Sequence, residues 1–167
     1  QLVEAGTQPG SQQEEGNAER LSNIVFMGMG EPLANYANTV AAVRLINAET
    51  GMNVGARKLT LSTVGLPSQM MRLANENLQI NVAISLHAPT DELRREIIPW
   101  AEKIAIEEIV EAARYYFEKT GREVTIEYIL LADVNDGPEQ ANQLVALARK
   151  MRCNVNLIRY NPVPGLP

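Results

Sequence analysis

The chain has 167 residues, 46% of them hydrophobic, and a formal net charge of −5 at pH 7, which allows one compact domain with its own core. The net negative charge argues against nucleic-acid binding by the whole surface, so any such contact requires a local basic patch. With no apolar run near the roughly 20 residues of a membrane helix, no signal-peptide pattern and a single cysteine, Cys153, we expect a cytoplasmic protein without membrane contact or internal disulfide.

Residues 1–20 are rich in Gln, Glu and Gly and lack a sustained apolar period, which predicts a flexible N-terminal segment. From residue 21 onward, short apolar runs alternate with helical patterns, so we assign residues 21–167 to one α/β domain. The predicted strands are 23–27, 58–62, 80–85, 125–131 and 154–159. Each is apolar on both faces, which is typical of a parallel sheet covered by helices.

Helices are predicted between these strands. Residues 106–117 carry apolar side chains at helical spacing, and Gly121 follows as a C-terminal stop. Residues 36–48 and 140–151 show the same periodicity. Thr90 and Asp91 predict a capped short helix that extends through residue 97.

The first strand ends abruptly in the sequence GMGEP, residues 28–32. Gly28 and Gly30 tolerate positive φ and close backbone approach, and Pro32 prevents the strand from continuing. Glu31 is therefore expected at the carboxyl-terminal tip of a parallel strand, where α/β folds bind their ligands.

Polar residues also follow the other strands. Carboxyl ends of parallel strands share one edge of the sheet, so we expect a common mouth formed by Glu31, Ser62, Ser85, His87 and Asn161. A carboxylate, two hydroxyls and an amide suit a polar ligand with an amine and hydroxyl groups. The pattern favours neither a Ser-His-Asp triad, since no nucleophile elbow is present, nor zinc, since the chain has one His and one Cys.

The segments that carry these residues resemble the radical S-adenosylmethionine (SAM) ribosomal RNA adenine-C2 methyltransferases of the RlmN type, with the Cfr enzymes close by. The motifs occur in order over residues 21–167: GMGEPLAN, LSTVGL, SLHAPTDELRREIIP, VTIEYILLADVND and VNLIRYNPVPGLP. The resemblance implies a partial (β/α)6 radical SAM barrel and methylation of C2 of an adenine in 23S rRNA and also in tRNA.

The same resemblance implies the cofactors and their contacts. They are SAM and, in the parent protein, a 4Fe-4S cluster. Gly30 and Glu31 correspond to residues that contact the methionine end of SAM, and the other contact positions are Ser62, Ser85, Leu86, His87 and Asn161.

Three departures from the family change the expectation for this chain. The Cys-x3-Cys-x2-Cys loop that binds the cluster is absent, as is the methyl-carrying cysteine, and Cys153 matches neither. The first barrel strand and an N-terminal domain would lie upstream. We therefore expect a catalytically inactive piece. Its exposed edge at residues 23–27 should lead to dimerisation, domain swapping or occlusion by the N-terminal segment, and a monodisperse monomer with a solvent-open edge in light scattering and structure would contradict this.

Two other functions remain open. The chain could be a non-catalytic module that binds an adenosine ligand or RNA. An unrelated β/α-barrel aldolase or isomerase ranks last, because Lys58 lies at the wrong end of its strand for catalysis. Arg94 and Arg95 follow the SLHAP motif and are either solvated charges or contacts to RNA phosphate.

Overall fold

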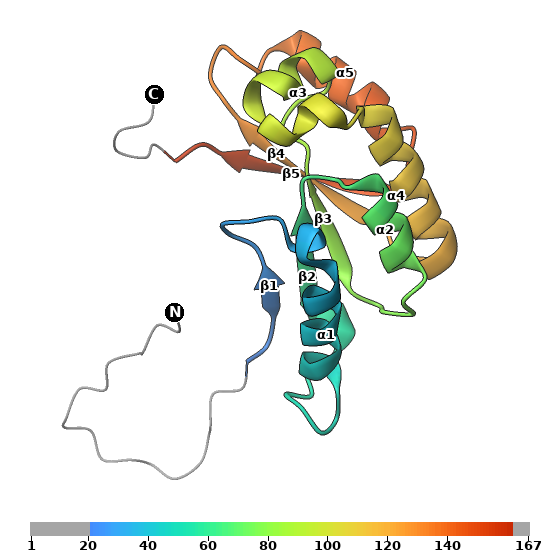
Figure 1. Cartoon of the computed structure of the whole chain (residues 1–167). Coiled ribbons are helices and arrows are strands. Elements are labelled where there is room, and N and C mark those ends of the chain that lie inside the picture. Colours follow the sequence, from blue (N-terminus) through green and yellow to red (C-terminus); the bar gives the residue numbers. More distant parts are fainter. Residues whose placement is uncertain (1–20, 162–167) are drawn as a thin grey trace, which may run out of the picture.

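The computed structural model describes residues 21–161, which form one five-stranded sheet with helices packed beside it (Figure 1). The strands are β1 (Ile24–Phe26), β2 (Leu59–Thr63), β3 (Asn81–Ser85), β4 (Val124–Leu130) and β5 (Cys153–Arg159). They pair in the order β1-β2-β3-β4-β5, and every neighbouring pair is parallel. The predicted parallel α/β sheet is confirmed, whereas the predicted flexible segment 1–20 and residues 162–167 of the domain lie outside the described residues.

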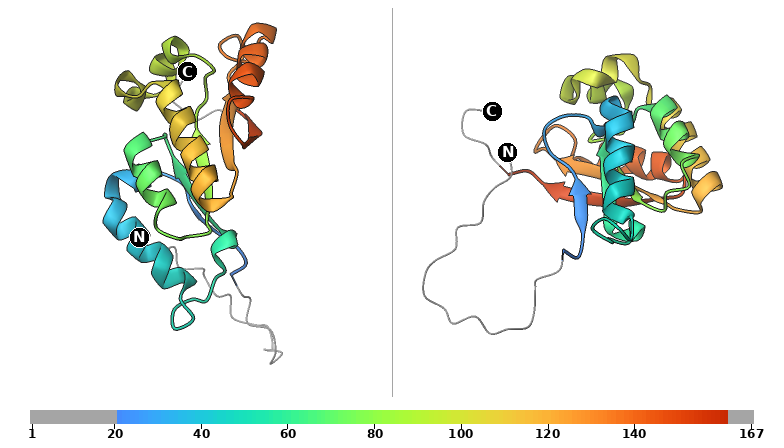
Figure 2. Two further views of the ribbon diagram at one scale, coloured as in Figure 1. Left: turned by 90° about the vertical axis from the view of Figure 1, so that its right-hand side faces the viewer. Right: turned by 60° about the horizontal axis from the view of Figure 1, so that its bottom comes forward.

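Helices connect successive strands. They are α1 (Tyr36–Asn47), α2 (Pro67–Ala74), α3 (Asp91–Ile97), α4 (Ile106–Thr120) and α5 (Pro138–Ala148), with short 3-10 helices η1 (Pro32–Asn35), η2 (Ala56–Lys58) and η3 (Pro99–Lys103). Right-handed crossovers between sequential parallel strands place the helices on one face of a sheet. Figures 1 and 2 show α1, α2, α4 and α5 on the same face of a curved sheet, as in a segment of a β/α barrel.

The expectation that the strands are apolar and covered on both faces is confirmed for β3, in which Val82, Ala83 and Ile84 are all buried, but it is wrong for β2 and β4. In β2, Leu59, Leu61 and Thr63 are buried, while the alternate residues Thr60 and Ser62 are only partly buried. The same alternation occurs in β4. Because strand side chains alternate between faces, one face of the sheet packs against helices and the other presents polar groups.

The longest helix, α4, forms for the reasons that the sequence suggests. Ile106, Ile109 and Tyr116 of its apolar stripe are buried against the rest of the core. The helix ends at Gly121, whose φ of 69° is left-handed and whose N–H donates to the carbonyl of Phe117 at 2.8 Å. The predicted cap of α3 is also present, since the Thr90 hydroxyl accepts from the N–H of Leu93 at 3.4 Å.

Helix α2 is not among the predicted helices, although it contributes Met70 and Leu73 to the core. It has only 8 residues, too few for a long periodic pattern, but Pro67 at its first turn is a recognisable helix-start signal. The helix predicted at 140–151 is displaced, because α5 starts at Pro138 and ends at Ala148.

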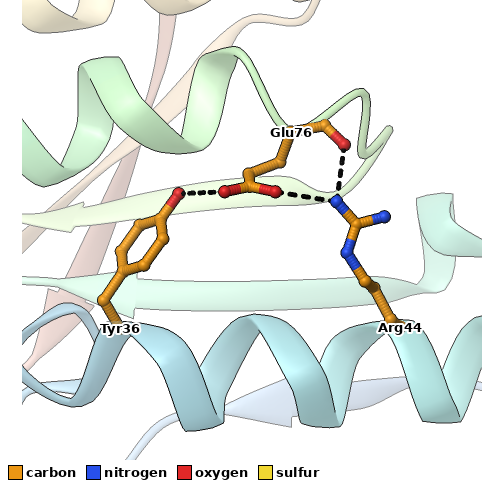
Figure 3. A network of polar contacts seen from close by, with 3 residues as sticks. All are labelled: Tyr36, Arg44 and Glu76. Atoms are coloured by element: carbon orange, nitrogen blue, oxygen red, sulfur yellow. Dashed lines mark hydrogen bonds and ion pairs between the residues drawn. The ribbon is translucent and has the colours of Figure 1, made fainter.

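A polar network ties α1 to the turn that follows α2 (Figure 3). The Glu76 carboxylate accepts from the Tyr36 hydroxyl at 2.9 Å and from the Arg44 guanidinium at 2.7 Å. The two donors lower the pKa of Glu76, Arg44 more than Tyr36. The Arg72 guanidinium lies 4.0 Å from the centroid of the Tyr36 ring. These contacts link α1 to α2 and the turn after it, although an ion pair this exposed stabilises by about 1 kcal/mol or less.

The two outermost strands each pair on one side only within residues 21–161. On β1, the side chain of Val25 is 56% exposed, and Met27 just beyond the strand is 48% exposed. Self-association through this edge stays a prediction. In the described part of the chain, no helix is both long enough and apolar enough to cross a membrane.

Candidate functional site

Glu31 lies directly after β1 and is held from two sides. One carboxylate oxygen accepts from the N–H of Leu33 at 2.9 Å, which caps η1. The other accepts from the N–H of Val64, just after β2, at 2.7 Å. The carboxylate therefore fixes the ends of two neighbouring strands, and each oxygen keeps a second lone pair for another donor.

Four of the predicted site residues surround one hollow at the carboxyl edge of the sheet: Gly30, Glu31, Ser62 and Ser85. The Ser62 and Ser85 hydroxyl oxygens lie 3.4 Å apart on adjacent strands. The hollow has a volume of about 90 Å³, well below the ~300 Å³ or more of typical small-molecule sites. It has room for one end of a ligand, and the rest would lie along the open face of the sheet.

Gly30 needs to be glycine because of its backbone conformation. Its φ is +103°, a region that other residues rarely adopt, yet no other part of residues 21–161 lies within 4 Å of the place of a Cβ atom. Glycine is therefore needed at position 30 for the turn and not to avoid a steric clash, and the space beside its backbone is open.

His87 does not line this hollow but joins the ends of β3 and β4. Its φ is 59°, its ring Nδ1 accepts from the N–H of Ile129 at 3.1 Å, and its own N–H donates to the carbonyl of Glu127 at 3.3 Å. Burial, and secondarily the positive charge of Arg94, lowers the pKa of His87. The ring is thus neutral at pH 7, with its proton on Nε2 because Nδ1 is an acceptor.

Asn135, in the loop after β4, is a buried residue that supports the His87 loop, a role that the sequence does not indicate. It is 1% exposed, and its amide donates to the carbonyls of His87 at 2.8 Å and Ile129 at 2.7 Å. Its side-chain oxygen accepts from the N–H of Leu131 at 2.7 Å. The only sequence signal was the turn-forming segment DVND, which gives no partner. Asn135 holds the loop of His87 against the end of β4.

The two remaining predicted residues lie apart from the hollow. The Leu86 side chain is 2% exposed in the hydrophobic core, so only its backbone can face a ligand. Asn161 follows β5 and is exposed. It lies at the same edge of the sheet as Glu31, because β1 and β5 run in the same direction, but at the opposite end of the strand order.

The residues present differ in how well they suit the two cofactors. The carboxylate, hydroxyls and open glycine backbone match a ligand with an ammonium, a carboxylate and a ribose, as SAM has. An iron-sulfur cluster does not fit this chain, because such clusters are held by several cysteine thiolates. The sequence contains one cysteine, and within residues 21–161 no three His, Cys, Asp or Glu side chains gather at a metal-binding distance.

Comparisons with known proteins identify the family of the chain. Residues 11–145 match the family model described as the radical SAM superfamily, so the chain belongs to this superfamily. Membership implies SAM and a 4Fe-4S cluster as the cofactors of the family.

Curated relatives place the chain more closely, in the RlmN family. It is 52% identical over 156 residues to the probable dual-specificity RNA methyltransferase RlmN of Symbiobacterium thermophilum, covering 93% of this chain and 42% of the relative. It is 48% identical over 151 residues to the ribosomal RNA large subunit methyltransferase N of Nitrosopumilus maritimus, covering 90% and 43%.

A solved structure shows the same arrangement. A radical SAM methyltransferase from Sphaerobacter thermophilus superposes with a TM-score of 0.85 at 48% identity, over 88% of this chain and 43% of that protein. The five-stranded sheet thus matches part of the radical SAM fold. The chain spans less than half the length of these relatives.

Proposed function

We propose that this chain is part of a radical SAM RNA methyltransferase that methylates C2 of an adenine in 23S rRNA and in tRNA. The observation that carries the proposal is the gathering of Gly30, Glu31, Ser62 and Ser85 around one hollow. The relatives' names, probable dual-specificity RNA methyltransferases, support the reaction class. The sheet would then be a partial (β/α)6 barrel without its first strand and cluster loop.

The hollow would receive the amino-acid end of SAM. The Glu31 carboxylate can accept from the ammonium group through the lone pairs that Leu33 and Val64 leave free. Ser62 and Ser85 would donate to the carboxylate or to the ribose. Leu86 through its backbone, His87 and Asn161 would contact the remainder along the sheet edge. Bound SAM supplies the methyl and adenosyl groups for radical methylation, and the protein supplies position.

We also propose that the chain alone does not methylate RNA, since it has one cysteine and the cluster requires several. The chain alone would then act as the non-catalytic adenosine-ligand module that the sequence left open.

Titration calorimetry on the chain tests the binding site. We expect SAM to bind, and Glu31→Gln to weaken its affinity by about tenfold or more, because a charged acceptor is lost while side-chain size is kept. Glu49→Gln is the matched control, since Glu49 is an exposed acid outside the hollow and should leave the affinity unchanged. Absence of heat with the unchanged chain would overturn the SAM site.

A second assay separates the functional alternatives. The chain is mixed with SAM labelled in its methyl group, a reductant and an RNA hairpin that contains adenines. We expect no incorporation of label, and any incorporation would contradict the proposed inactivity. If the same hairpin bound the chain in a gel-shift titration while calorimetry showed no SAM binding, the result would instead favour the RNA-binding alternative.

A further inference from the structure

Arg94 of α3 is neither a solvated charge nor a phosphate contact, the two roles that the sequence left open. Its side chain is completely buried, whereas the adjacent Arg95 is exposed. Its guanidinium donates to the carbonyls of Val64 at 2.5 Å and Ile104 at 3.3 Å. Within residues 21–161 its Nε has no acceptor, and no ion pair involves it.

A buried guanidinium whose partners are only carbonyls is unusual, because burying a charge costs free energy unless it is paired. Burial lowers the pKa of Arg94, although the nearby Asp91 carboxylate opposes this effect. Methionine could fill a similar apolar space without that cost. Packing alone therefore does not explain why an arginine occupies this position. The location of the two carbonyls that it binds suggests another role.

The shorter contact leads to the candidate site. The carbonyl of Val64 accepts a hydrogen bond from the Arg94 guanidinium, and the N–H of Val64 donates to the Glu31 carboxylate at 2.7 Å. The next residue, Gly65, has a φ of +86° and donates its N–H to the Thr63 hydroxyl at 3.0 Å, so the chain turns sharply here. One residue after β2 thus joins a buried cation to the carboxylate at the end of β1.

We propose that Arg94 is a positioning residue, which holds Val64 and thereby orients the Glu31 carboxylate toward the ammonium group of the ligand. The inference rests on the proposed function, because it assigns Glu31 to the amino-acid end of SAM. Arg94 itself touches no ligand. Its charge-assisted hydrogen bond fixes the Val64 backbone more firmly than a neutral donor would.

The affinities of two ligands distinguish a positioning role of Arg94 from a general structural role. SAM contains the amino-acid portion, and 5′-methylthioadenosine lacks it. For Arg94→Met we expect the SAM affinity of the chain to fall by about tenfold, in line with losing a hydrogen bond to a charged group. The 5′-methylthioadenosine affinity should stay within about twofold. Arg95→Met is the matched control and should change neither affinity.

Arg94→Lys provides a second test of the inference in case the Arg94→Met chain does not fold. Lysine keeps the charge but lacks the planar fork that reaches two carbonyls, so a smaller and equally selective loss for SAM is expected. In a Glu31→Gln background, Arg94→Met should cause no further loss for SAM, because the group being positioned is already altered.

Equal weakening of both ligands by the Arg94 variants would show a merely structural role and overturn the inference. Unchanged SAM affinity in a folded Arg94→Met chain would also overturn it. Absence of binding of both ligands to the unchanged chain would refute the proposed function itself, and the inference with it, so the two failures are distinguishable.

Discussion

Gly65 provides a sharp test of how the β2 end is built, because both its conformation and its surroundings exclude a side chain. A Cβ at this position would lie 2.8 Å from Cδ1 and 3.1 Å from Cγ1 of Ile109, on the buried face of α4. The φ of +86° adds strain for any other residue. We expect Gly65→Ala to cost roughly 1–2 kcal/mol for the left-handed backbone and about 1–3 kcal/mol more for the overlap.

Gly121→Ala is the matched control for the backbone contribution. Gly121 also has a positive φ, 69°, but in the described part of the chain nothing lies within 4 Å of its Cβ position, so only the strain of about 1–2 kcal/mol applies. Free energies of unfolding come from urea titrations of the unchanged chain and of each variant. Ile109→Val removes the closest methyl group and should recover part of the Gly65→Ala loss in the double variant. Equal losses for the two glycine substitutions would refute the steric argument.

Two further predictions concern the loops after β3 and β4. His87 has a lowered pKa because of burial, so on acidification the unfolded chain gains a proton near pH 6.5 before the folded chain does. Stability should therefore fall from pH 7.5 to 5.5, by at most about 1.4 kcal/mol per pH unit. His87→Asn, which tolerates the positive φ, should show a shallower fall in urea titrations at each pH, and a parallel profile would contradict the assignment. Asn135→Ala should cost about 2–4 kcal/mol, because it leaves several buried backbone groups without partners. Asn38→Ala on the exposed surface of α1 should cost less than about 0.5 kcal/mol, and similar losses for both in thermal melts would exclude the bridging role.

The sequence predicted the candidate site in part, and the outcome differs among residues for physical reasons. Gly30 and Glu31 are marked by a strand that stops at glycine and proline, which is a local signal. Ser62 and Ser85 join them because parallel strands bring their carboxyl ends together. His87 and Leu86 follow the same strand as Ser85, but the left-handed turn at His87 directs this segment into the β3–β4 junction, which no local pattern foretells.

The amino-acid sequence by itself determined the parallel α/β architecture and the edge of the sheet where the polar residues gather. Both depend on short-range features: periodicity within a strand or helix, and glycine and proline at its ends. The tertiary structure decided which partners those residues meet. Glu31 finds the N–H of Val64 33 residues away, and Arg94 becomes buried against the carbonyl of the same residue. Such pairings arise because η1 packs against β2 and the Arg94 side chain of α3 reaches the residue after β2, and side-chain types along the chain do not specify them.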